Sequence, residues 1–80
     1  MKALFNCSGI KNVYLRDNDK IWVELEITYL DNSDRTWVSR RDMNKLSQTD
    51  KEYQIERYTK AFEKLKQALL NKEPFAEIEL

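Results

Sequence analysis

The sequence has no histidine and only one cysteine, one glycine and one proline in 80 residues. Histidine is the commonest general base and metal ligand in proteins, so its absence argues against both kinds of site. The single cysteine, Cys7, excludes an internal disulfide and is typical of a reducing compartment. With so little glycine and proline, the chain has no glycine-rich phosphate loop and no flexible linker.

The charge is balanced, with 14 lysines and arginines against 14 aspartates and glutamates. A strongly basic chain would indicate nucleic-acid binding, and a strongly acidic one would indicate a nucleic-acid mimic. No apolar run approaches the roughly 18 residues of a membrane span, and the apolar start turns polar at Asn6, too early for a signal peptide. We therefore expect a cytoplasmic protein without membrane association, folded as one compact domain over residues 1–80.

The clearest secondary-structure signal is a strand from Lys20 to Leu30. Apolar residues alternate there with mostly polar ones, and the apolar set is Ile21, Val23, Leu25, Ile27 and Tyr29. A period of two with β-branched and aromatic residues predicts a strand with one buried face.

Residues 10–16 form the preceding strand, and an Asp- and Asn-rich turn predicts a hairpin between the two. A three-residue loop sets Leu15 opposite Ile21 on the apolar face and Tyr14 beside Trp22 on the polar face. A two-residue loop would instead move the aliphatic side chains of the first strand to the polar face. We favour the three-residue loop, because a slip of one residue should not leave those side chains in water.

A third strand is expected over residues 35–41, after a second turn at 31–34. The favoured register pairs Leu30 with Arg35, because it matches apolar residues on one face and opposite charges on the other. In this register the opposed residues are Val38 and Ile27 on the apolar face, and Trp37 with Thr28 and Arg41 with Glu24 on the polar face.

From Asp50 the apolar period changes to three and four, which predicts a helix. Its apolar stripe consists of Ile55, Tyr58, Phe62, Leu65 and Leu69. Thr49 and Glu52 form a predicted capping box, and Asn71 and Pro74 predict the end of the helix. The stripe is expected to cover the sheet. The alternative is that the stripe forms the seam of a coiled-coil dimer. This interpretation is weaker, since the stripe spans only about two heptads and a coiled coil needs three or four.

These elements predict an α+β fold. Residues 2–7 are expected to add a strand, joined at Ser8 and Gly9, so that an antiparallel β-meander of about four strands results. One long helix packs on one face of the meander, and residues 75–80 form a short C-terminal strand. The chain is expected to be a monomer or a homodimer.

Three patterns resemble catalytic or metal sites, and each has a simpler interpretation. Cys7 lacks a histidine partner and falls in an apolar strand, which indicates a core thiol. The two turns, at 17–19 and 31–34, resemble fragments of a calcium loop but lack its glycine and its final glutamate. Glu24 and Glu26 share one strand face, where cross-strand ion pairs are favoured over a metal pair. We expect neither enzymatic activity nor a cofactor.

The polar face of the sheet carries the candidate binding site. Tryptophan, tyrosine and arginine are the residues enriched in binding hot spots, and the predicted registers gather them there. The proposed binding residues are Trp37, Trp22, Arg35, Tyr14 and Arg41. One alternative is that these aromatic side chains only pack on one another and on arginine stems. Another is that residues 1–7 or 75–80 fold over this face.

Two functions fit such a face. The first is a protein-binding module without enzymatic activity, of the kind in which a small viral or mobile-element protein inhibits a host machine by direct binding. Only size and type support that narrower interpretation. The second, which we rank lower, is a single-stranded nucleic-acid-binding domain that stacks bases on aromatic side chains beside arginines. Glu24 and Glu26 on the same face would repel phosphate.

Overall fold

The computed structural model of the protein describes residues 2–18, 21–30 and 36–79, with the backbone alone described for 18 and 36–42. In chain order the elements are β1 (Lys2–Asn6), a 3₁₀ turn (Cys7–Gly9), β2 (Ile10–Asn18), β3 (Trp22–Tyr29), β4 (Thr36–Asp42), α1 (Gln48–Leu70) and β5 (Phe75–Glu79). The predicted α+β class, the long helix and the C-terminal strand are confirmed.

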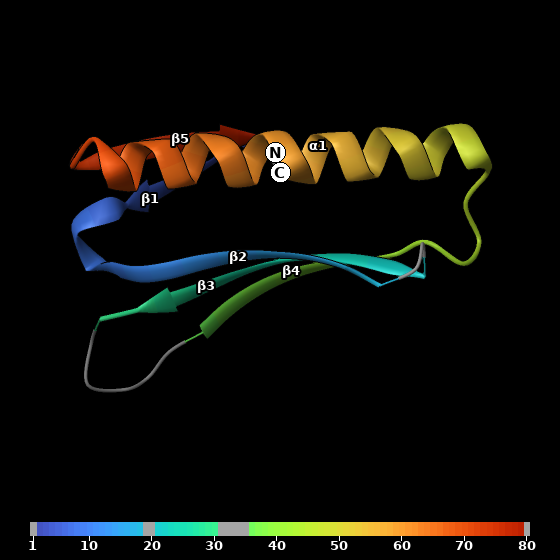
Figure 1. The fold of residues 1–80 in the computed structure, drawn as a ribbon, viewed down its shortest axis with the longest axis horizontal. Coiled ribbons are helices and arrows are strands. Elements are labelled where there is room, and N and C mark those ends of the chain that lie inside the picture. The colour runs from blue at the N-terminus through green and yellow to red at the C-terminus, as the bar shows by residue number, and fades with distance from the viewer. Residues whose placement is uncertain (1, 19–20, 31–35, 80) are drawn as a thin grey trace.

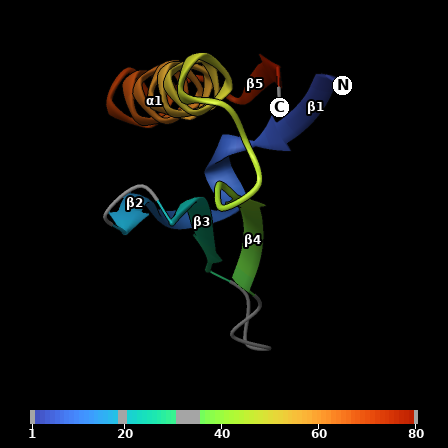
Figure 2. The ribbon, with the colours of Figure 1, turned by 90° about the vertical axis from the view of Figure 1, so that its right-hand side faces the viewer.

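The strands form two antiparallel sheets, one ordered β2-β3-β4 and the other β1-β5. Figure 1 shows α1 running along the length of the molecule above the three-stranded sheet. Figure 2, which looks along α1, shows β5 and then β1 beside the helix, with β2 below it. The helix therefore contacts both sheets.

β1 had been expected to join β2 in a meander of about four strands. It pairs with β5 instead, so the meander has three strands. The β1–β5 ladder runs from Lys2 opposite Glu79 to Asn6 opposite Phe75. The 3₁₀ turn makes this possible, because the backbone N–H of Cys7 donates to the carbonyl of Pro74 at 3.0 Å. That hydrogen bond keeps the chain beside β5 until the turn redirects it into β2.

Both strands of the small sheet bury alternate residues, as their sequences suggest. Phe5 of β1 and Ala76 and Ile78 of β5 are buried, while the residues between them are exposed. On the exposed side, the Lys2 ammonium lies 3.8 Å from the Glu77 carboxylate. Such an exposed ion pair contributes about 0–1 kcal/mol, so the buried side chains hold this sheet in place.

The predicted core of β3 is confirmed over three of its five positions. Val23, Leu25 and Ile27 are almost completely buried, and Tyr29 is partly buried against them. Ile21 was expected in this set, but its side chain is 46% exposed. Since β3 begins at Trp22, Ile21 precedes the part of the strand that α1 covers.

The buried face of α1 is rotated relative to the predicted stripe. Tyr58 and Leu65 of that stripe are buried, whereas Ile55, Phe62 and Leu69 are only partly buried. The other buried residues of α1 are Gln54, Ala61 and Ala68. The rotation follows from the position of the helix between two sheets, since its alanines allow β5 to approach closely.

The ends of α1 are capped by side-chain and backbone hydrogen bonds. Ser47 is the N-cap, and its hydroxyl accepts from the backbone N–H of Asp50 at 3.2 Å. The predicted cap at Thr49 is therefore wrong by two residues. At the other end Lys72 takes a left-handed conformation with φ 55°. This lets the N–H of Glu73 reach the carbonyl of Ala68 at 3.0 Å, a Schellman motif.

Leu65 and Leu4 offer a comparison of core and surface truncation. The Leu65 side chain is fully buried, and that of Leu4 is 69% exposed. Leu65→Ala should lower the free energy of unfolding by about 2–5 kcal/mol, because it leaves a cavity between helix and sheets. Leu4→Ala should cost less than about 1 kcal/mol. Urea unfolding followed by circular dichroism measures both, and equal costs would contradict the burial of Leu65.

The position of the helix cap can be tested by two neighbouring substitutions. Ser47→Ala should cost about 1 kcal/mol of unfolding free energy, because the N–H of Asp50 loses its acceptor. Thr49→Ala should be close to neutral, since alanine is the better helix former. The same urea titration distinguishes the two, and a larger cost at Thr49 than at Ser47 would restore the cap predicted from the sequence.

Candidate functional site

Two of the predicted site residues, Tyr14 and Trp22, have described side chains, and both lie on the face of the three-stranded sheet that points away from α1. Along β2 and β3, residues that alternate with the buried ones make up this outer face. Its described side chains are those of Asn12, Tyr14, Arg16, Trp22, Glu24, Glu26 and Thr28, all exposed or partly buried. Tyr14 and Trp22 therefore lie on the face that was predicted for them.

The pairing of β2 with β3 differs from the predicted register by four residues. Leu15 lies opposite Leu25, where Ile21 had been expected. The ladder continues to Asn18 opposite Trp22, so the chain turns later than predicted. A displacement by an even number keeps every side chain on its face, which is why the predicted faces are right although the register is wrong.

This register separates the two aromatic side chains that had been expected side by side. Tyr14 lies opposite Glu26, and Trp22 lies opposite Asn18. The two positions are four residues apart along the ladder, which corresponds to about 13 Å of strand. Trp22 and Tyr14 thus share the outer face without forming one aromatic cluster.

The pairing of β3 with β4 differs from the predicted register by one residue. Trp37 lies opposite Ile27 rather than Thr28. The predicted pairing of Leu30 with Arg35 itself lies outside the described residues. An odd displacement exchanges the two faces, so the reason for placing Trp37 on the outer face no longer holds. The side chain of Trp37 and the whole of Arg35 lie outside the described residues, and their role in binding stays a prediction.

The same displacement changes the expected partner of Glu24. Arg40 lies opposite Glu24 in the ladder, and Arg41 lies opposite Val23. The predicted cross-strand pair of Arg41 with Glu24 is therefore wrong in its register. The side chains of both arginines are outside the described set, so Arg41 too remains a predicted binding residue.

Tyr14, Arg16 and Glu26 form a cluster on the outer face. The Arg16 guanidinium carbon lies 5.9 Å from the centre of the Tyr14 ring, and the Tyr14 side chain is 43% exposed. Arg16 Nη2 lies 3.8 Å from Glu26 Oε1 on the neighbouring strand. An exposed cation–π contact stabilises by about 0.5–1 kcal/mol, enough to bias the orientation of the Arg16 side chain.

Arg16 was missed as a site residue in the sequence, although a signal was present. It follows Tyr14 by two residues, and residues two apart on a strand share a face. Once Tyr14 is placed outside, Arg16 belongs beside it whichever even register the hairpin adopts. The diagonal contact with Glu26 could not be found in this way, because it depends on the register.

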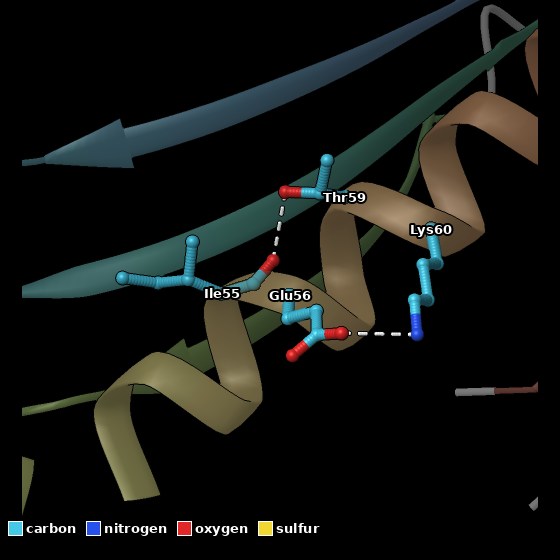
Figure 3. A network of polar contacts seen from close by, with 4 residues as sticks. All are labelled: Ile55, Glu56, Thr59 and Lys60. Atoms are coloured by element: carbon cyan, nitrogen blue, oxygen red, sulfur yellow. Dashed lines mark hydrogen bonds and ion pairs between the residues drawn. The ribbon is translucent and has the colours of Figure 1, made fainter. Parts of the chain in front are cut away.

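A groove lies on each side of α1. The β2–α1 groove, about 390 Å³, is lined by Lys11, Asn12, Val13, Tyr14, Leu15, Phe62, Lys66, Leu69 and Leu70. The β5–α1 groove, about 310 Å³, is lined by Tyr53, Glu56, Arg57, Lys60, Ala61, Lys64, Ile78 and Glu79. In the second groove Lys60 Nζ lies 3.0 Å from Glu56 Oε1. Figure 3 shows this ion pair on the same turn of α1 as the Thr59 hydroxyl, which donates to the Ile55 carbonyl at 2.8 Å. Carboxylates thus interrupt its row of cations.

Cys7 is buried, with 6% of its surface exposed, and it lies in the 3₁₀ turn rather than within a strand. Burial raises the pKa of its thiol, and the negative charge of Glu73 raises the pKa further. The thiolate is the nucleophilic form, so both effects make Cys7 a poor nucleophile.

The comparisons and the searches for known kinds of site give no functional assignment. No family model, no curated protein and no solved structure matches the chain. Among the described side chains, those of residues 2–17, 21–30 and 43–79, no three His, Cys, Asp or Glu form a group that could hold a metal ion. Within the same part of the chain, no helix has the length and apolarity required to cross a membrane.

The inaccessibility of Cys7 can be measured with Ellman's reagent. At pH 8 the native protein should react at least about tenfold more slowly than the urea-unfolded chain, because the thiol is buried and protonated. The native rate should still rise as the pH passes 9.0, the ordinary pKa of a cysteine thiol. A Ser8→Cys variant gives the control, since Ser8 is exposed and the new thiol should react fast. Rapid labelling of native Cys7 would contradict its burial.

Proposed function

We propose that this chain is a protein-binding module without enzymatic activity and that it binds through the outer face around Tyr14. The observation that supports this most directly is the Tyr14–Arg16–Glu26 cluster, in which an exposed ring and a guanidinium are held next to each other on a strand. Tyrosine and arginine dominate binding hot spots. A tyrosine on a rigid strand also loses little conformational entropy when a partner covers it.

The charges of the outer face favour a protein over a single-stranded nucleic acid. Glu24 and Glu26 accompany Arg16 on this face, so it presents both signs within a few residues. Sequence-independent binding of single strands relies on a positively charged groove that follows the phosphates. A protein partner can match mixed charges by complementary ones, which gives specificity more than affinity.

The proposal extends to the remaining predicted residues and to a narrower role. Trp22 lies on the same face. Trp37, Arg35 and Arg41 stay proposed binding residues, but Trp37 and Arg41 stand opposite the buried Ile27 and Val23 in the ladder, so they would not add to the outer face itself. We also propose that binding blocks the partner, as a small viral or mobile-element inhibitor of a host machine would. Only the small size and general type of the chain support this narrower role, and the single free cysteine supports a cytoplasmic location.

Tyr14→Ala, with Tyr53→Ala as its matched control, tests the outer face. Tyr53 is an exposed tyrosine on α1, 61% accessible and remote from the outer face. A partner is first recovered with the wild-type chain as bait and identified by mass spectrometry. Tyr14→Ala should then weaken its binding by about 2 kcal/mol or more, roughly 30-fold. Tyr53→Ala should bind like the wild type, and both should keep the wild-type thermal unfolding.

The alternative function has its own readout in the same experiment. A fluorescent single-stranded oligonucleotide replaces the protein partner, and anisotropy is followed at low and high salt. Tight binding that falls steeply with salt and is lost in Tyr14→Ala would establish nucleic-acid binding in place of the proposal, because released counterions cause such a slope. If Tyr14→Ala binds the recovered protein as tightly as the wild type, the outer face is not the binding site.

A further inference from the structure

The edge of β2 is open along a strand of nine residues. Among the described strands, only β3 pairs with β2, and it does so on one side. On the other side, alternate residues of an edge strand direct their N–H and C=O groups outward, where another strand can pair with them. β2 contains no proline that would prevent such pairing.

An apolar row of α1 runs beside this edge. Phe62 and Leu69 are only partly buried, and Leu70 is 69% exposed, and all three line the β2–α1 groove together with Leu15 of β2. The only charged groups lining this groove are the ammonium groups of Lys11 and Lys66, and Lys66 Nζ lies 5.3 Å from the centre of the Phe62 ring. The groove thus joins an open strand edge to an uncovered apolar surface.

We propose that the partner of this edge is a second copy of the chain. The two β2 strands pair antiparallel about a two-fold axis that passes through Tyr14, so that the two three-stranded sheets join into one of six strands. A two-fold axis perpendicular to the sheet keeps both helices on the same side of it. Because α1 lies above β2 (Figure 2), the apolar rows of the two helices then face each other across the seam.

The residues of β2 are self-complementary in this register. About Tyr14, Val13 lies opposite Leu15 of the second copy, on the face that packs under the helices. Lys11 lies opposite Asp17, and symmetry makes two such pairs. Lys11 is the residue at which the β2–β3 ladder is irregular, since the pairing passes from Ile10 directly to Asn12, and its exposed, flexible side chain can reach across. Opposite charges at facing positions stabilise a strand pair.

Other registers fit less well. Residues that oppose each other in an antiparallel pair point to the same face of the sheet. A register centred between two residues would oppose inner-face residues to outer-face ones, so the axis must pass through a residue. Centring on Val13 places Lys11 opposite Leu15, and centring on Leu15 places Asp17 opposite Val13. Each of these leaves a charge facing an aliphatic side chain, so charge complementarity selects the register centred on Tyr14.

A strand pair alone would not make a stable interface. Stable interfaces bury about 1,200–2,000 Å² in total, more than two edge strands can provide. The facing apolar rows of the helices supply the additional area in the proposed dimer. The inference does not rest on the proposed function, although Tyr14 belongs to both surfaces, because it is argued from the open edge of β2 and the β2–α1 groove and its charge reversals leave the Tyr14–Arg16–Glu26 cluster unchanged.

The test is the molar mass of the full chain in solution, measured by light scattering after gel filtration from micromolar to millimolar concentration. The wild type should reach twice its chain mass of 9.6 kDa. Lys11→Asp and Asp17→Lys should each weaken dimerisation by roughly tenfold, because each turns two attractive pairs into repulsive ones. Neither residue belongs to the Tyr14–Arg16–Glu26 cluster, so partner binding reports separately on the proposed function.

The decisive experiment is to mix the two variants and measure whether dimerisation is restored. A Lys11→Asp chain paired with an Asp17→Lys chain restores both opposite-charge pairs, so the mixture should form a heterodimer of wild-type affinity. Glu77→Lys on β5 is the control and should dimerise like the wild type. Circular dichroism confirms that every variant is folded.

Three results would overturn the proposal. A mass of 9.6 kDa at every concentration would show that the chain does not self-associate. A dimer that is insensitive to both charge reversals would place the seam elsewhere on the molecule. Weakened single variants without rescue on mixing would rule out the register centred on Tyr14.

Discussion

One helix has to cover two sheets, and most features of this fold follow from that constraint. Leu65 and Tyr58 form the centre of the buried face of α1, with Ala61 on the side of β5 and Phe62 on the side of β2. A small residue toward one sheet and a large one toward the other let a single helix reach both. Because packing of an amphipathic face supplies most of the stability of a helix, neither sheet would be covered without this division.

The sequence predicts which side chains of β2 and β3 face the core but not how the two strands pair. Alternation of apolar and polar residues determines the face, and any even displacement preserves it. The register depends on where the hairpin turns, and the Asp- and Asn-rich stretch after Leu15 allows more than one turn position. As a result, the outward placement of Tyr14 and Trp22 was predictable, whereas their separation along the sheet was not.

For β4 the alternation itself is ambiguous. Trp37 and Val38 are adjacent, so they occupy opposite faces of the strand. Both are large and apolar, so the alternation does not show which of the two occupies the inner face. A cross-strand pairing of Arg41 with Glu24 seemed to decide between them, but Arg40 precedes Arg41 and offers the same charge one residue earlier. Two neighbouring arginines cannot distinguish registers that differ by one residue.

The pairing of β1 with β5 was beyond local sequence patterns for another reason. The two strands stand at opposite ends of the chain, and a strand that follows the first along the chain is the commoner neighbour. A long-range signal was nevertheless present, because β5 carries acidic residues between apolar ones and β1 begins with Lys2. The ion pair between Lys2 and Glu77 uses that complementarity, although it is too exposed to have imposed the pairing alone.

The charges on β2 bear on whether its open edge is protected or used. Native proteins often protect edge strands with charged side chains, and Lys11 and Arg16 could be understood in that way. Protection against a second copy requires, however, that like charges meet when the strands pair. Lys11 and Asp17 have opposite signs at equal distances from Tyr14, so an antiparallel copy meets attraction at both ends. The same helix that covers two sheets leaves Phe62 and Leu69 incompletely buried beside this edge, and a second copy is the partner that would complete their burial.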